Sequence, residues 1–466
     1  MRRRSFLETL CRVAPGFAAA ALLPGAAFAQ RALLSKDRLI VRSGRPEDLE
    51  TPAQLLNSWI TPNELFFVRS HFYTPIIDAS SWRLQVDGNV DNVLILTLDD
   101  IRRMPSTTVT ATLECAGNGR AFFEPPVPGV QWRRGAVGTA AWTGVRLADV
   151  LRRAGVTANT RYIWVDGADT GVGAAPDFIR SVPIGKAMQR ETLLAYDMNG
   201  EPLPVSHGFP LRAIVPGWEG AYSVKWLTHL QASPRDHDGA FVQAGYRYPR
   251  KPVAPGTLDA VADTVPLRDM PVKSIITVPG ADSMFQVGEP LSVAGFAWAG
   301  EADIARVDVS TDGGGTWQPA QLGRDRARYA WRQFEYIWRT PAAGSHRVLS
   351  RATDTRGRPQ PAIPAWNPAG YVWNAVDAVA VHVGTAVPQR AVAPAVAQGG
   401  DSALLNSKCL ICHDAGLIAQ QRLDAAGWGR EVDKMIGWGA PVARAERDRL
   451  IADLVRLFPA HRSAVP

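Results

Sequence analysis

The sequence predicts a multidomain chain: an α+β domain at 30–255, an immunoglobulin-like β-sandwich at 256–385 and an all-α unit at 401–466. Three patterns carry this prediction. The first region mixes short β-type runs with helical patterns, the second has short alternating strands between Gly, Pro and Asp turns, and the third is helical throughout. Residues 386–400 are rich in Ala, Pro, Gln and Gly, which is typical of a linker.

Each region is justified by its own segments. In the α+β domain we expect strands at LFFVRSHF, WRLQVDG and LRAIVPG, and helices at LADVLRRAG and PIGKAMQRETLLAY. In the sandwich, PLSVAGFAWAG, IARVDVSTDGGGTW and HRVLSRATD are short strands that end at turn residues. The last region contains LLNSKCLICHDAG, WGREVDKMIGWG and RAERDRLIADLVRLF, which we expect to be helical.

Residues 1–29 have the pattern of an export signal, with a charged start, a short apolar run and a small-residue cleavage site before Gln30. The R-R-x-F-L pattern at residues 3–7 favours the twin-arginine route over an ordinary secretory signal. That route carries folded proteins, which suits a cofactor that is inserted before export. We therefore expect a periplasmic protein.

The mature chain gives no sign of a membrane span or of nucleic-acid binding. After residue 30 it has no run of about 18 or more apolar residues, the length that a spanning helix needs. The formal net charge is +7, and part of it belongs to the arginine-rich leader. The remaining charge is weakly positive and no lysine-rich tract supports a nucleic-acid partner.

A C-x-x-C-H motif, Cys409 to Cys412 followed by His413, lies in the C-terminal region. This spacing is the attachment signature of haem c, in which two thiols bind the haem and the histidine is the proximal iron ligand. A thioredoxin-like C-x-x-C is the alternative, but no βαβ pattern surrounds the motif. Met435 is the only later methionine and would be the sixth iron ligand; the alternatives are His461 or a core methionine.

Cys115 is the one cysteine of the mature chain that the haem motif does not explain. It lies in LECAGNGR, between a β-type run and a Gly-rich turn. It is therefore either a small buried apolar residue or a metal ligand. A thiolate favours a soft or borderline transition metal, and one cysteine cannot hold zinc or an iron–sulfur cluster unaided. A cofactor that brings its own sulfur ligands would fit.

Several segments resemble the sulfite oxidase family in order along the chain. LECAGNGR resembles C-A-G-N-x-R, FFVRSHFYTP follows F-x-R-x-H, and WTGVRLADVLRRAG follows W-x-G-x-x-L-x-D-V-L. Residues 193–227 follow the long block that contains H-G-x-P-x-R and K-W-L. The likeness covers roughly residues 35–385, and the tail W-x-x-x-V-x-x-M-x-x-x-G-A-P resembles small single-haem cytochrome c domains.

This resemblance implies a molybdenum–molybdopterin cofactor and a role for each matching residue. Cys115 would be the protein ligand to molybdenum. Arg69 and Arg120 would flank the substrate oxyanion, and Tyr246 would be the active-site tyrosine, with Tyr248 as the fallback. The residues that would cradle the cofactor are His71, His207, Arg212 and Lys225.

One segment departs from the family pattern. Many relatives carry a further substrate-contacting arginine in a late W-N-x-x-G segment, but PAWNPAGYVWNA (364–375) has none. Trp366 and Trp373 lie in that neighbourhood instead. The loss of a positive group from an anion pocket could weaken sulfite binding or admit a larger sulfur substrate.

The resemblance implies oxidation of sulfite, or of a related sulfur oxyanion, to sulfate, with electrons passed through the haem to a soluble cytochrome c. The alternatives are a sulfane dehydrogenase, a sulfoxide or nitrate reductase of the same fold, and an electron carrier without catalysis. Because sandwich domains of this family often mediate dimers, a homodimer is a further expectation.

Overall fold

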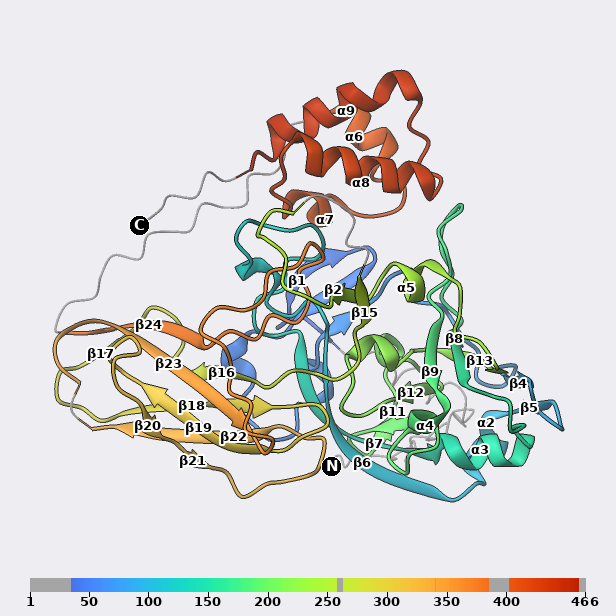
Figure 1. Ribbon diagram of the computed structural model, residues 1–466, viewed down its shortest axis with the longest axis horizontal. Coiled ribbons are helices and arrows are strands. Elements are labelled where there is room, and N and C mark those ends of the chain that lie inside the picture. The colour runs from blue at the N-terminus through green and yellow to red at the C-terminus, as the bar shows by residue number, and fades with distance from the viewer. Residues whose placement is uncertain (1–34, 258–262, 340, 385–401, 461–466) are drawn as a thin grey trace, which may run out of the picture.

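The computed structural model describes residues 35–257, 263–339, 341–384 and 402–460 (Figure 1). The predicted leader, the whole predicted linker and His461 lie outside these described residues. In Figure 1 the sheet-rich first region, the yellow and orange sandwich and the red C-terminal helices are separate bodies. Within the described residues no helix is long and apolar enough to cross a membrane.

The first region contains two five-stranded sheets. One has the order β5-β4-β13-β8-β9 and the other the order β11-β10-β7-β6, with β12 also paired to β10. Their strands are β4 Leu84–Gly88, β5 Leu94–Leu96, β6 Ser106–Glu114, β7 Val137–Arg146, β8 Tyr162–Gly167, β9 Arg180–Pro183, β10 Leu193–Met198, β11 Glu201–Pro202, β12 Arg212–Ile214 and β13 Leu227–Ser233.

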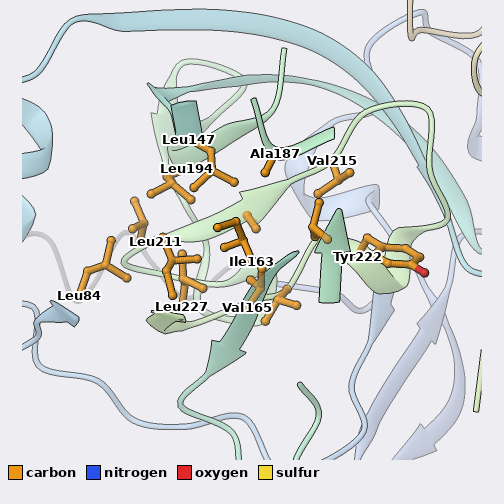
Figure 2. Packing of buried hydrophobic residues seen from close by; sticks show 14 of the residues in the cluster. Leu84, Leu147, Ile163, Val165, Ala187, Leu194, Leu211, Val215, Tyr222 and Leu227 are labelled. Atoms are coloured by element: carbon orange, nitrogen blue, oxygen red, sulfur yellow. The ribbon is translucent and has the colours of Figure 1, made fainter. Parts of the chain in front are cut away.

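A smaller antiparallel sheet precedes them and consists of β1 Ile40–Gly44, β2 Glu47–Glu50 and β3 Val68–Arg69. Figure 2 shows the main core, in which Leu84, Ile163, Leu194 and Leu227 pack together from four different strands. The short helices and 3-10 turns of this region are η1 Ala53–Leu55, η2 Asn63–Leu65, α2 Leu98–Arg102, η3 Arg120–Phe122, α3 Leu147–Ala154, α4 Ile184–Ala187, η4 Val205–His207, η5 Gly220–Tyr222 and α5 Ala240–Gln243.

The helix α3 confirms the helical pattern of LADVLRRAG. Leu147, Val150, Leu151 and Ala154 are buried at helical spacing, and Gly155 ends the helix in a left-handed conformation with φ of 70°. The helix expected over PIGKAMQRETLLAY is wrong in its second half. Only α4 is helical, and LLAY begins β10.

The reason for this correction is tertiary. The residues Leu193, Leu194 and Ala195 are completely buried, and β10 pairs with β7 on one side and with β11 and β12 on the other. The hydrogen bonds and burial of an interior strand override the helical propensity of leucine and alanine.

The sandwich follows after the small sheet of β14 Arg247–Pro249 and β15 Thr264–Pro266. Its sheets have the orders β16-β18-β22-β21 and β17-β24-β23-β19-β20, and their inner faces share one apolar core. The strands are β16 Lys273–Val278, β17 Ser283–Phe285, β18 Leu291–Trp298, β19 Ile304–Ser310, β20 Gln318–Pro319, β21 Gln321–Leu322, β22 Arg332–Trp338, β23 Gly344–Asp354 and β24 Asp377–Val383.

Four helices form the small C-terminal unit: α6 Ala403–Lys408, α7 Ala415–Ala419, α8 Ala425–Gly437 and α9 Arg444–Leu457. Ser402, Asp414 and Asp424 cap the first three by accepting a backbone hydrogen bond from the first turn. Trp428 and Leu450 lie in their shared core. That these helices form a cytochrome c domain stays a prediction.

Candidate active site

A pocket opens between β3, the end of β6 and the 205–226 segment. The structure brings into its wall seven residues that the sequence placed at the active site. They are Arg69, His71, Cys115, His207, Arg212, Lys225 and Tyr246. Other parts of its wall are apolar, from Phe66, Phe67, Leu113 and Phe178.

Cys115 follows β6 directly, at a turn held by the hydrogen bond from the Asn118 amide to the Cys115 carbonyl (2.8 Å). Burial raises the pKa of the Cys115 thiol, while the positive charges of Arg69 and Arg120 lower it. Both arginines therefore favour the thiolate, which is the form that binds a metal.

The residue before the cysteine anchors this turn to the sandwich. The Glu114 carboxylate accepts hydrogen bonds from Lys273 Nζ (2.7 Å), Trp298 Nε1 (2.8 Å) and Asn118 Nδ2 (3.0 Å), all in a buried environment. Lys273 Nζ also donates to the Asn118 carbonyl at 2.9 Å. The sandwich thus fixes the position of the thiol as well as packing beside it.

Arg120 lies behind the cysteine turn, and it is absent from the lining of the pocket. Its guanidinium donates to the carbonyls of Val130 (2.9 Å) and Ala369 (3.2 Å). A Cβ on Gly117 would lie 2.6 Å from the guanidinium nitrogens, so a side chain there would displace the Arg120 guanidinium. Arg120 acts on Cys115 through its charge in this structure; its contact with a substrate stays a prediction.

Arg69 faces the pocket and pairs with Asp48 of β2 at 3.1 Å. Burial lowers the pKa of Arg69, but the charge of Asp48, which also accepts a hydrogen bond from Arg69, is the foremost of the effects that outweigh it and raise the pKa above its ordinary value. The guanidinium therefore stays charged at every working pH. It is suited to a bidentate contact with an oxyanion.

His71 and Tyr246 form a pair, with 2.7 Å between His71 Nε2 and the tyrosine hydroxyl. Burial, together with the charges of Arg69 and Arg180, holds the pKa of His71 well below its ordinary value, so the imidazole is neutral. Burial also raises the pKa of the Tyr246 hydroxyl, which therefore keeps its proton. The fallback residue Tyr248 is 37% exposed, outside the pocket wall.

Two basic side chains of the pocket wall, Arg212 and Lys225, come from the 205–226 segment. Arg212 donates to the carbonyls of His207 (2.9 Å) and Ser223 (2.8 Å), and Lys225 Nζ donates to Ser70 Oγ (2.8 Å) and the Ser206 carbonyl (3.0 Å). Burial lowers the pKa of Arg212 to about 9, and burial together with Arg212 lowers the pKa of Lys225 to about 7.

An anionic ligand fits this environment. The Nε of Arg212 is buried and has no hydrogen-bond partner among the described residues, although a buried guanidinium nitrogen is costly to leave unpaired. A phosphate on a pterin would satisfy it and would restore the charge on Lys225. The free thiol of Cys115 on the same wall supplies a soft ligand for the metal of such a cofactor.

Three residues of the site were missed from the sequence. Lys36 Nζ lies 2.8 Å from His207 Nε2 and also donates to the Asn63 carbonyl at 2.7 Å. Arg180 lies over the ring of Tyr246, with 4.8 Å from its central carbon to the ring centroid. Asp169 lines the pocket, and burial raises its pKa to about 6. Each comes from a segment without a motif signal in the sequence.

The segment that lacks an arginine supplies aromatic side chains instead. Tyr371 stacks on Tyr246 with 5.5 Å between ring centroids, and the Val372 amide donates to the Ala116 carbonyl at 2.8 Å. Trp373 packs on Phe123 and covers the cysteine turn at Gly119, where a Cβ would lie 2.5 Å from the indole. None of this segment's residues lines the pocket itself; the segment packs behind the wall, against Tyr246 and the cysteine turn.

The remaining predicted ligands lie in the C-terminal unit. Cys409 and Cys412 are free thiols between α6 and α7. His413 follows them, and its side chain is half-buried. Met435 lies near the end of α8. The donor set suits covalent haem with a histidine ligand, but haem attachment and the iron ligands stay predictions.

Family models match two parts of the chain. Residues 71–241 match the oxidoreductase molybdopterin binding domain, and residues 265–384 match the Mo-co oxidoreductase dimerisation domain. Together with the cationic pocket around a free thiol, these matches define the class as a molybdopterin-binding oxidoreductase.

The relatives narrow this class. The chain is 39% identical over 351 residues to chicken (Gallus gallus) sulfite oxidase, covering 72% of this chain and 76% of that protein. It is 38% identical over 363 residues to human (Homo sapiens) mitochondrial sulfite oxidase, covering 74% and 66%. The chain therefore belongs to the sulfite oxidase family.

A solved structure is similar across most of the fold. The sulfane dehydrogenase SoxCD from Paracoccus pantotrophus matches with a TM-score of 0.64 and 28% identity, over 82% of this chain and 96% of that chain. The matched family domains end at residue 384, before the C-terminal helices begin.

Proposed function

We propose that this protein oxidises sulfite to sulfate at a molybdenum–molybdopterin cofactor bound by Cys115. The observation that carries the proposal is the pocket itself, in which a free thiol, a charged Arg69 and an orphaned Arg212 nitrogen share one wall. Similarity to the chicken and human sulfite oxidases supports the substrate class.

The reaction takes one water and balances as SO₃²⁻ + H₂O giving SO₄²⁻, two protons and two electrons. When bound, the molybdenum supplies two-electron oxygen-atom transfer. The chain supplies binding and orientation. Arg69, held charged by Asp48, would bind two oxygens of the sulfite through its guanidinium fork.

The pair of His71 and Tyr246 would orient the substrate. The Tyr246 hydroxyl keeps its proton, and the neutral His71 Nε2 can accept it at 2.7 Å. An oxyanion beside the hydroxyl would take that hydrogen bond instead. A donor placed before the reaction lowers its barrier without any reorganisation of solvent.

The cofactor would be held by the cationic end of the pocket. Arg212 and Lys225 would pair with its phosphate, and His207 would contact it while accepting from Lys36. The negative charge of the phosphate would stabilise the charged forms of Arg212 and Lys225 and would therefore raise their pKa values toward the ordinary range.

For the two electrons we propose transfer, one at a time, through a haem c attached at Cys409 and Cys412 and then to a soluble cytochrome c. The C-x-x-C-H motif and its position beside the β1–β2 sheet support this route. Export by the twin-arginine pathway to the periplasm, where such an acceptor can be reached, is part of the same proposal. A homodimer through the sandwich is supported by the match of that region to the dimerisation domain.

A second candidate is dehydrogenation of a sulfane sulfur substrate. The 364–375 segment carries no arginine, and its Tyr371 stacks on the pocket residue Tyr246, which favours a larger and less charged substrate. Similarity to the sulfane dehydrogenase SoxCD adds support.

A steady-state assay of the purified mature protein separates these candidates. Sulfite, thiosulfate and sulfoxides are compared, with cytochrome c as the acceptor for the oxidations. Sulfite should give the highest kcat/KM. A preference for thiosulfate would favour the second candidate, and reduction of a sulfoxide without sulfite oxidation would overturn both.

A further inference from the structure

The haem-attachment segment is the part of the C-terminal unit that touches the rest of the protein at the β1–β2 turn. The Asp414 carboxylate, next to His413, accepts hydrogen bonds from the Ser43 hydroxyl (3.2 Å), the Gly44 amide and the Arg45 amide (3.2 Å). The Asp414 amide donates back to the Arg45 carbonyl at 2.9 Å. One side chain thus connects both bodies through several hydrogen bonds.

The motif itself is also held. Arg45 Nη2 donates to the Leu410 carbonyl at 2.5 Å, and the Tyr73 hydroxyl donates to the Cys412 carbonyl at 3.3 Å. Both carbonyls belong to the C-x-x-C-H loop. Figure 1 shows the same arrangement at lower detail, with α7 facing β1.

A second group of contacts lies just after the end of α7. The Gln131 amide donates to Gln420 Oε1 at 2.7 Å, and the Gly129 amide donates to Gln421 Oε1 at 3.1 Å. A third contact involves α8, where the Ala174 amide donates to the Trp438 carbonyl at 3.1 Å. The Gln420 side chain also donates to the Arg42 carbonyl of β1 at 3.0 Å, so the first two groups of contacts adjoin and the Trp438 contact lies apart from them. Contacts at more than one place fix the orientation of the unit, whereas a single contact would allow rotation.

The docked turn is joined directly to the pocket. In the small sheet Ser43 pairs with Asp48, and Asp48 pairs with Arg69 of the pocket wall. Tyr73 lies two residues after His71, which also lines the pocket. Two short chain segments therefore run from the pocket wall to the C-x-x-C-H loop.

We propose that the C-terminal unit is fixed on the β1–β2 turn through Asp414, so that electrons pass from the pocket to the haem within one docked arrangement. This inference rests on the proposed function for the electron transfer, but the docking can be measured without it. Transfer in a fixed complex needs no domain movement, which otherwise occurs in microseconds to milliseconds and depends on solvent viscosity.

The test compares Asp414→Ser with Asp424→Ser in the full mature holoprotein. Serine is a good helix N-cap, so both variants keep a cap on α7 or α8. The two variants differ at the β1–β2 turn. The serine side chain at position 414 is too short to reach the turn, whereas Asp424 caps α8 and its replacement leaves the contacts of Asp414 in place. Tyr73→Phe is a further variant outside the helical unit, and it removes the hydrogen bond to the Cys412 carbonyl without changing a residue of the C-x-x-C-H motif.

Hydrogen exchange gives a readout that is independent of activity. In the wild type, the amides of Gly44, Gly129, Gln131 and Ala174 should be protected, because their acceptors belong to the helical unit. Asp414→Ser should speed their exchange by about tenfold or more, including at Ala174, and Asp424→Ser should not. Wild-type exchange at the rate of exposed amides would overturn the docking.

Haem reduction after mixing with sulfite gives the second readout. In the wild type its intramolecular rate should not change as viscosity is raised, and in Asp414→Ser it should become slower and viscosity-dependent. A viscosity-dependent wild-type rate would overturn transfer within the docked state. Absence of a haem absorption band would instead refute the proposed electron route. The hydrogen-exchange result would then still decide whether the C-terminal unit is docked.

Discussion

Lys273 is the residue that most directly connects the sandwich to the cysteine turn, and its replacement by methionine should destabilise that connection. Lys273 and Glu114 have side chains only 5% and 4% exposed, and their charged atoms lie 2.7 Å apart. Removal of one partner leaves a buried carboxylate with only Trp298 Nε1 and Asn118 Nδ2 as donors. Breaking a buried pair in this way costs about 3–5 kcal/mol.

The expected result is a lower midpoint of thermal unfolding, by about 6–20 °C for domains of this size. The assay is differential scanning calorimetry of Lys273→Met at constant pH, with molybdenum content as a second readout of the cysteine turn. Glu114→Gln in the Lys273→Met background removes the unpaired charge and should recover more than half of the loss. A loss of unfolding free energy below about 1 kcal/mol in the single variant would refute the reasoning, and so would the absence of any recovery in the double variant.

Three further predictions concern the pocket and the haem. Tyr246→Phe removes the hydrogen bond to His71 and should lower kcat/KM for sulfite about tenfold, the equivalent of one hydrogen bond; an unchanged value in steady-state kinetics would remove the hydroxyl from catalysis. Burial lowers the pKa of Lys36 to about 7. Between about pH 7 and 10.5 the unfolded state therefore binds a proton that the folded state lacks, so the free energy of unfolding rises with pH in this window. Lys36→Met should therefore flatten the pH dependence of the unfolding free energy of cofactor-free protein by about 1.4 kcal/mol per pH unit in that window, and identical slopes would contradict the burial of this ammonium. Met435→Ala should shift the haem reduction potential or spin state in a spectroelectrochemical titration, and no change would assign the sixth ligand elsewhere.

Much of the pocket could be predicted because its residues lie in contiguous motifs. Cys115 next to a Gly-rich turn, and His207 and Arg212 in one block, carry their own signals in the sequence, and the structure places all three in the pocket wall. Burial in the structure distinguishes the two tyrosines, because Tyr246 is buried at the pocket whereas Tyr248 is on the surface.

The rest depends on contacts between distant segments. Lys36 reaches His207 across 171 positions, and the sequence around it has no distinguishing pattern. Arg120 has the expected motif position, but whether its guanidinium faces the pocket or the back of the turn depends on carbonyls at 130 and 369. The strand at LLAY was misassigned because its neighbours in the sheet, and not its own residues, determine its conformation.

The most direct test of the central claim is X-ray absorption at the molybdenum edge of the purified mature protein and of its Cys115→Ser variant. The account predicts that both bind molybdenum, that the variant has one sulfur ligand fewer, and that it has lost sulfite-dependent cytochrome c reduction. Equal numbers of sulfur ligands in the two proteins would contradict the assignment of Cys115 as the ligand, and so would sulfite oxidation retained by the variant.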